Sequence, residues 1–323
     1  MSSKKFVRSF LTFFVVLYAS TYLLYYLVNP EQIFKGSITS KKFYYSKEYS
    51  RKHYEMLKEQ PHVLVFGSSQ IHRISSEIMG KPVLNMHNIY CEPGDILNFL
   101  TQLDEKQLSN VDKILFVIDL RAGAHRIDDD LINYSQKPVH YPVLTLTALS
   151  RTLDDIVKNW RSSTAGYLNA DGSIEHVDPN THIKRLPSYP YPPKMDYHDQ
   201  LISDLLEINR FALANKKDII FFTPVTNRKF LKSMDFEYLQ SFFEKLLSGG
   251  IEQIKFFYFV EGLSDLRNEN DEPMTFLDPD HLNAYYVKKW LHEYILEEGK
   301  YDIGNESELS NYIDQMQILQ ASE

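Results

Sequence analysis

The chain has 323 residues, of which 43% are hydrophobic and 24% are charged, so it is long and apolar enough to form a globular domain with its own core. Its formal net charge of -8 argues against a general nucleic-acid-binding protein, because such proteins carry a basic surface. The single cysteine, Cys91, excludes an intramolecular disulfide, and we interpret it as a small buried residue rather than a nucleophile.

Residues 1–30 consist of a short basic tail and an uncharged, apolar stretch from Ser9 to Pro30. A helix over residues 10–28 would be roughly 28 Å long, about the thickness of one hydrocarbon core. We therefore predict a cytoplasmic tail and an uncleaved single-pass anchor, with the rest of the chain extracytoplasmic. A cleavable signal peptide and a buried helix of a soluble core are the alternatives. Residues 31–60 are basic and rich in tyrosine, and we expect them to form a membrane-proximal connector that ends in a short helix.

Five short apolar runs follow within residues 61–300, each bounded by polar or turn residues. Continuous apolar runs are typical of strands that are buried on both faces of a parallel sheet. Helical patterns begin between these runs, near Gly94, Asp196 and Phe236, and a helical tail is expected over 301–323. This alternation predicts a flavodoxin-like, three-layer α/β/α domain with about five parallel strands. The predicted strands are residues 62–67, 82–86, 113–119, 218–224 and 254–260.

The connection after the third predicted strand is unusually long, and we treat residues 124–195 as an insertion. The segment "PSYPYPP" within it is stiff and extended, so we expect a lid or a substrate platform, with a merely decorative excursion as the alternative. His176, Asp178, His182 and the acidic run 128–130 do not have the tight spacing of a metal site. The chain also lacks a Gly-x-Gly-x-x-Gly or Walker lysine loop, so we expect neither a metal nor a nucleotide cofactor.

Two short motifs point to chemistry. Gly67-Ser68-Ser69 follows the first predicted strand, and ligands of α/β sheets bind at the carboxyl ends of strands. Asp278-Pro279-Asp280-His281 precedes an amphipathic helical pattern, and its spacing can bring a carboxylate against an imidazole. A serine hydroxyl needs such a carboxylate-oriented imidazole as its base. Taken separately, each motif has an ordinary explanation, as a turn and as a helix cap.

Together, "FGSSQ" and "DPDH" resemble the first and last sequence blocks of the SGNH (GDSL-like) hydrolase superfamily. With the N-terminal anchor, the chain is most similar to membrane-anchored branches that serve teichoic-acid D-alanylation and exopolysaccharide acetylation. The resemblance implies a triad in which Ser69 is the nucleophile, His281 the base and Asp278 the residue that orients the imidazole. Ser68 is the alternative nucleophile if the register is shifted by one, and Asp280 could compete with Asp278.

The middle blocks depart from the family pattern. In the second block, Tyr90 or His87 aligns near the glycine whose N–H enters the oxyanion hole, and Gly94 comes later, where it could instead start the helix. The resemblance implies that backbone N–H groups near Ser69 and in the 87–94 loop hold the oxyanion. The third block lacks its usual asparagine, and Asp119 and Arg121 occupy that region. Arg121 either replaces the asparagine as a donor, binds an anionic substrate or pairs with Asp119.

Another polar group follows the fourth predicted strand, where it either lines the pocket or forms a hydrogen-bonded turn. It consists of Thr223, Thr226, Asn227 and Arg228.

The expected function is that of a membrane-anchored serine esterase or O-acyltransferase. Its substrate would be an acylated cell-envelope polysaccharide or a teichoic-acid-like polymer, and an acyl-transfer membrane protein is a candidate partner; we expect no nucleic acid. The alternative is a catalytically inactive member of the same fold that serves as a scaffold or binding subunit of a polysaccharide-modification complex. The departure of the second and third blocks from the family pattern favours this alternative.

Overall fold

A computed structural model of the chain describes residues 3–28, 60–87, 93–120, 150, 153, 157, 166–168, 173–176, 198–226, 228–264, 276–278, 281–282, 284–297, 299 and 301–322. Only the backbone is described for Ser69, Asp278 and His281. The predicted connector up to residue 59, together with Tyr90, Cys91 and Arg121, lies outside these ranges. Most of the 124–195 insertion does as well.

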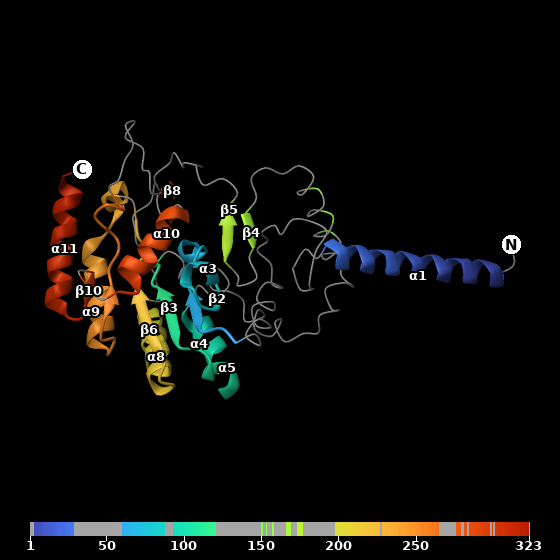
Figure 1. Cartoon of the computed structure of the whole chain (residues 1–323), viewed down its shortest axis with the longest axis horizontal. Coiled ribbons are helices and arrows are strands. Elements are labelled where there is room, and N and C mark those ends of the chain that lie inside the picture. The colour runs from blue at the N-terminus through green and yellow to red at the C-terminus, as the bar shows by residue number, and fades with distance from the viewer. Residues whose placement is uncertain are drawn as a thin grey trace.

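A six-stranded sheet forms the centre of the protein, in the order β10-β7-β6-β3-β1-β2 (Figure 1). All five predicted strands are present, and neighbouring strands among them pair in parallel. They are β1 (Val63–Phe66), β2 (Val83–Asn85), β3 (Lys113–Val117), β6 (Asp218–Phe222) and β7 (Ile254–Lys255). The sixth strand, β10 (Asp302–Ile303), pairs antiparallel with β7, so the sheet is mixed. The sequence did not reveal β10 because two residues carry no strand periodicity.

The last predicted strand continues far beyond the part that pairs in the sheet. β7 ends at Lys255, yet Phe256, Phe257 and Tyr258 remain fully buried. The Phe257 N–H donates to the Thr223 hydroxyl, at 2.7 Å, in place of a strand neighbour. The apolar run therefore correctly predicts that these residues are buried, but only its first two residues form the hydrogen-bonded strand.

The helices follow the predicted pattern, with one break. The pattern that begins near Gly94 is divided into α4 (Pro93–Thr101) and α5 (Glu105–Ser109). The Asp104 side chain accepts the Gln107 N–H at 2.7 Å, and the Asp104 N–H donates to the Gln107 side-chain oxygen. This capping box starts the second helix. The other predicted helices are α8 (His198–Ala214), α9 (Phe236–Ser248), which stops at Gly249-Gly250, and the C-terminal α11 (Glu306–Ala321).

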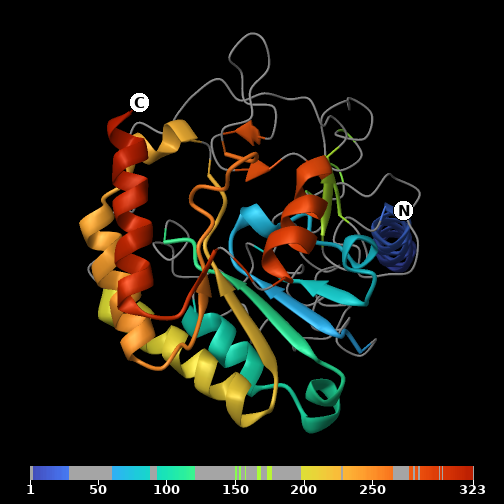
Figure 2. The same ribbon diagram turned by 60° about the vertical axis from the view of Figure 1, so that its left-hand side comes forward.

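Buried apolar side chains lie on both faces of the sheet. Because side chains alternate along a strand, Leu64 and Phe66 join a cluster with α4, α8, α9 and α11. Val63 and Val65 join a second cluster on the other face, with α10 (Ala284–Trp290) and the π-helix η6 (Leu291–Ile295) that continues it. Figure 2 shows α8, α9 and α11 on one side of the sheet and α10 on the other. This two-sided burial explains why the strand sequences are continuous apolar runs.

The N-terminal helix α1 (Ser3–Val28) is exposed along its length and stands apart from the sheet in Figure 1. Its segment Lys4–Leu24 is long and apolar enough to cross a membrane. The Thr12 and Thr21 hydroxyls donate to backbone carbonyls four residues earlier, which satisfies these polar groups within the helix. The helix begins earlier than the predicted residue 10, because the basic tail continues it.

Within the predicted insertion, β4 (Gly166–Leu168) and β5 (Ile174–His176) form a small antiparallel sheet. The role of the insertion as a lid or platform stays a prediction.

Candidate functional site

The turn that follows β1 requires glycine at its first position. Gly67 has a φ of 132°, which residues with a side chain rarely adopt. A Cβ atom there would lie 2.1 Å from Val117 Cγ1 and 3.0 Å from the Val117 carbonyl oxygen, so the turn passes tightly against the end of β3. This close approach gives the glycine a physical reason that is independent of any catalytic role.

The two serines of this turn have different roles in the backbone. Ser68 is buried, its carbonyl accepts the Ile71 N–H at 3.3 Å, and its hydroxyl accepts the Gln70 N–H at 3.5 Å. Its hydroxyl therefore closes its own turn. Ser69 begins the short 3-10 helix η2 (Ser69–Ile71), at the carboxyl end of β1. Ser69 stays the predicted nucleophile, with Ser68 as the alternative.

The second motif forms a small hairpin. β8 (Phe276–Asp278) and β9 (His281–Leu282) are antiparallel, and Asp278 is the direct cross-strand partner of His281. We expected the two residues to meet at a junction between a loop and a helix. They lie instead at the end of this hairpin, and α10 begins only at Ala284.

The two motifs come from opposite ends of the domain sequence, and the fold brings their backbones together. Cα atoms of β9 lie within 8 Å of Cα atoms of η2. Leu282, next to His281, is buried in the same apolar cluster as Ile71 and Ile74, which follow Ser69. The predicted serine and histidine segments are therefore neighbours at the carboxyl-terminal edge of the sheet.

A buried arginine and histidine follow η2, a feature that our sequence interpretation did not include. His72 and Arg73 are each only 4% exposed, and Arg73 Nε donates to His72 Nε2 at 3.1 Å. A guanidinium can only donate, so His72 Nε2 must accept and the imidazole carries its proton on Nδ1. The available signal was the segment "QIHR", which places polar residues directly after the turn.

A second histidine, His87, lies beyond the end of β2, with its ring centroid 6.0 Å from that of His72. Asn85 Oδ1 accepts both the His87 N–H and the His87 Nδ1–H, each at 3.1 Å. The His87 backbone N–H, one of the two alternatives for the oxyanion donor near the second block, is therefore already used. Tyr90 and Gly94 stay as the predicted donors, and Tyr90 lies outside the described residues.

Gly94 lies in the first turn of α4, where that helix approaches α8. A Cβ atom on Gly94 would lie 3.0 Å from Asp204 Oδ2. A side chain at this position would therefore require the Asp204 carboxylate to shift. Asp119, beyond the end of β3, is buried, and its predicted pairing with Arg121 falls on a residue outside the described ranges.

The polar residues after β6 form structural hydrogen bonds. Thr223 accepts the Phe257 N–H, and the Thr226 hydroxyl donates to the Tyr258 carbonyl at 2.6 Å. Arg228 Nη2 donates to the Ser322 hydroxyl, which lies just beyond α11. Both threonines are thus hydrogen-bonded, but to the segment that follows β7 rather than within a local turn. Asn227 lies outside the described residues.

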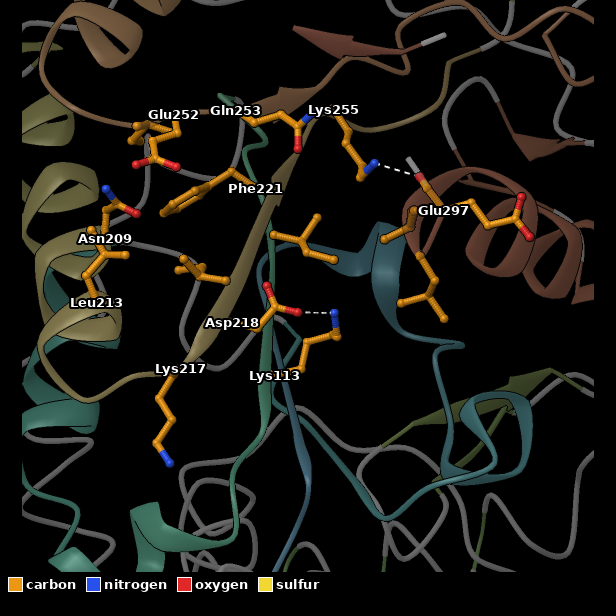
Figure 3. Close-up of a pocket in the computed structure, with 15 residues that line it drawn as sticks. Lys113, Asn209, Leu213, Lys217, Asp218, Phe221, Glu252, Gln253, Lys255 and Glu297 are labelled. Atoms are coloured by element: carbon orange, nitrogen blue, oxygen red, sulfur yellow. Dashed lines mark hydrogen bonds and ion pairs between the residues drawn. The ribbon is translucent and has the colours of Figure 1, made fainter. Parts of the chain in front are cut away.

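A hollow of about 370 Å³ lies elsewhere, beside the first half of β6 (Figure 3). β7 pairs with Phe221 and Phe222 only, so the edge of β6 before them has no strand neighbour in the described sheet on this side. The hollow is lined by Lys113 and Asp218, which form an ion pair at the amino ends of β3 and β6. None of the predicted site residues lines it, so it is not part of the candidate site. Among the described residues, no group of three or more metal-binding side chains occurs.

No protein-family model and no curated protein sequence matches the chain. The structure defines an α/β protein with a mostly parallel six-stranded sheet and an N-terminal helix able to span a membrane. Its candidate site is the carboxyl-terminal edge of the sheet, where η2 and β9 meet beside a buried pair of histidines.

Proposed function

We propose that the protein is a membrane-anchored serine esterase or O-acyltransferase with a three-layer, SGNH-type fold. Its substrate is an acylated cell-envelope polysaccharide or a teichoic-acid-like polymer. The observation that carries the proposal is the proximity of η2, which begins at Ser69, to β9, which begins at His281. A serine nucleophile and its base must lie within hydrogen-bonding reach, and the proximity of these two backbone segments makes that reach possible.

In the proposed reaction, the Ser69 hydroxyl attacks the ester carbonyl carbon while His281 accepts its proton. The carbon–oxygen bond to the alcohol then breaks, His281 returns the proton to the departing oxygen, and an acyl-serine remains. Water regenerates the serine in an esterase, and a sugar or polyol hydroxyl regenerates it in a transferase. Asp278 holds the imidazole in the correct tautomer, which agrees with its place directly across the hairpin from His281.

The membrane location rests on α1. Its basic residues, Lys4, Lys5 and Arg8, precede the apolar segment, so the proposal places the α/β domain outside the cytoplasm. An anchored enzyme acts on polymers that are held near the membrane, which agrees with the substrate class implied by the family resemblance.

A second candidate function is that of an inactive scaffold or binding subunit with the same fold. Two observations favour it: the His87 N–H is engaged by Asn85, and β3 leads into Ile118, Asp119 and Leu120 without an asparagine. Loss of one oxyanion donor costs about 10²–10³-fold in rate in a well-studied protease, so this candidate predicts very slow turnover or none.

The experiment that separates the two functions uses the full chain in detergent. We would measure fluorophosphonate labelling and hydrolysis of a chromogenic acetyl ester for the wild type, Ser69→Ala and Ser248→Ala. The proposed enzyme loses its label and at least ~10³-fold of its turnover in Ser69→Ala. Ser248→Ala keeps both, because that serine lies at the end of α9, where its hydroxyl bonds the Glu244 carbonyl. Absence of a Ser69-dependent label in folded wild type would support the scaffold.

A further inference from the structure

We propose that Asn85 is a positioning residue for the Ser69 nucleophile. Its side-chain amide ties the turn that begins at Ser69 to the end of β2, and the same amide holds His87 with its proton on Nδ1. The catalytic role of Asn85 rests on the proposed function, whereas the connection between the two segments rests on the hydrogen bonds of Asn85 alone.

The amide of Asn85 bridges two segments of chain. Its Nδ2 donates to the Ile71 carbonyl at 2.7 Å and to the Ile74 carbonyl at 2.8 Å, both within or just after η2. Its Oδ1 accepts the backbone N–H and the Nδ1–H of His87, each at 3.1 Å. All four hydrogen-bonding positions of the amide are therefore used.

Chemistry alone fixes the orientation of this amide. The Ile71 and Ile74 carbonyl oxygens can only accept, so the nitrogen of the Asn85 side chain must face them. The oxygen then faces His87, and because an amide oxygen can only accept, His87 Nδ1 must carry a proton. In its neutral form His87 has Nε2 as its basic nitrogen, which gives the bridge a spectroscopic signature.

Burial makes this bridge hard to replace. Asn85 is 0% exposed, so water cannot take over its bonds. The η2 turn has only three residues, and its own closing bond, from the Ile71 N–H to the Ser68 carbonyl, is long at 3.3 Å. Its position relative to the sheet therefore depends strongly on the two bonds from Asn85.

A displaced turn would move the nucleophile away from its base. Misplacement of a reacting group by 1 Å can cost ~10²-fold in rate. Because Asn85 contacts the backbone that follows Ser69 and not the substrate, its loss should lower kcat and leave KM largely unchanged.

The test replaces Asn85 by the isosteric aspartate. In Asn85→Asp, an ionised carboxylate faces two carbonyl oxygens and loses both donors, so we expect Ser69-dependent labelling to fall ~10²-fold at pH 8. Protonation of the new carboxyl restores one donor. The rate ratio of variant to wild type should therefore rise as the pH falls, and a buried aspartate placed elsewhere in the fold separates this effect from a general loss of stability.

The matched control is Asn209→Asp. Asn209 is also a buried amide, 7% exposed, and its Nδ2 donates to the Gly250 carbonyl at 3.0 Å, remote from Ser69. The same chemical change there should lower the thermal midpoint and leave the labelling rate within ~2-fold of wild type, since distant sites act independently. Equal losses of labelling in the two variants would overturn the positioning role of Asn85.

Nitrogen NMR of the imidazoles tests the bridge without any assay of activity. We expect wild-type His87 to show the Nδ1–H tautomer; an Nε2–H tautomer would contradict the amide orientation and overturn the inference. If wild type has the Nδ1–H tautomer but no Ser69-dependent label, the proposed function fails while the bridge stands. If Asn85→Asp does not fold, Asn85→Ser supplies one hydroxyl donor in its place, and wild-type labelling kinetics in Asn85→Ser overturn the positioning role.

Discussion

The two ends of the parallel strands carry polar side chains in opposite ways. At the amino ends, His62 pairs with Asp112 at 3.0 Å and Lys113 pairs with Asp218, and these four side chains are 27% to 58% exposed. At the carboxyl ends, Asn85 and His87 are fully buried, and their bonds connect different segments of chain. Both ends contain charged or polar side chains, but among these residues only Asn85 and His87 are buried.

The two ends therefore differ in how their polar groups affect the stability of the fold. Exposed ion pairs contribute little to stability, because water and salt compete with them. A buried polar group destabilises the fold unless it is fully hydrogen-bonded, so a satisfied buried network specifies one arrangement. The fully hydrogen-bonded Asn85 amide therefore specifies one arrangement of the carboxyl-terminal edge, where the proposed site lies.

The largest effect is expected from Gly67→Ala, which forces a side chain into the turn of the candidate site. The added Cβ would overlap Val117 and would strain a φ of 132°, so we expect a loss of about 4 kcal/mol in the free energy of unfolding. Urea unfolding measures it. The control is Gly80→Ala, which also has a positive φ but nothing within 4 Å of the added atom, and should cost about 1 kcal/mol. Equal losses would show that the turn does not pack tightly on β3.

The next effect concerns the buried ion pair between Lys255, which lines the hollow, and Asp302 of β10. It tests whether burial, rather than position at one end of the strands, decides how much a polar pair contributes to stability. Lys255 Nζ lies 2.5 Å from Asp302 Oδ1, with the side chains 6% and 11% exposed. Asp302→Asn removes the negative charge beside the buried Lys255 ammonium, which still donates to the Glu297 carbonyl, and should cost about 3 kcal/mol. Chemical denaturation at pH 7 measures the loss. A loss below ~0.5 kcal/mol would mean that burial does not govern the difference between these polar groups.

A smaller, pH-dependent effect is expected at Tyr312 of α11. Burial raises the pKa of its phenol, and the hydrogen bond from the Phe259 N–H, at 3.2 Å, opposes this shift in part. The unfolded state ionises first, near pH 10, so stability from this group is present below that pH and is lost as the pH rises.

Tyr312→Phe should therefore be about 1 kcal/mol less stable than wild type at pH 7, because the Phe259 N–H loses its acceptor. The gap should narrow between pH 10 and 11, since only the wild type suffers the ionisation. Urea unfolding of both proteins across this range measures the gap. A gap that stays constant with pH would contradict the raised pKa.

The smallest effect is expected from Asp218→Asn at the amino-terminal end. Lys113 and Asp218 are 27% and 57% exposed, so the loss should be below ~0.5 kcal/mol and should disappear in 1 M salt. Unfolding at low and high ionic strength measures it. A loss as large as that of Asp302→Asn would remove the distinction between the exposed and buried pairs.

Local chemistry explains which parts of the fold could be predicted. All five parallel strands were found because burial on both faces makes their sequences continuously apolar. The break at Asp104 was missed because a capping box competes with a helical apolar pattern that continues through it. β10 was missed because its two residues depend on pairing with β7, which no local pattern encodes.

For the candidate site, the sequence supplied the residue types and the fold supplied their neighbours. The glycine-serine turn and the Asp-x-x-His motif were visible as motifs, yet nothing in either motif states that η2 and β9 pack together. The roles of Asn85, His72 and Arg73 were invisible, because a buried polar residue looks the same in a sequence as an exposed one. Only its contacts in the folded protein distinguish a buried polar residue from an exposed one.

The sequence by itself determined the strands, most of the helices, the apolar N-terminal segment and the two chemical motifs, because periodicity and turn chemistry act over a few residues. The tertiary structure alone decided which polar groups lie buried at one edge of the sheet, that Gly67 must be glycine because of Val117, and that the serine and histidine segments are neighbours. These features depend on contacts between segments that are far apart along the chain, and such contacts form only when the sheet brings the strand ends together.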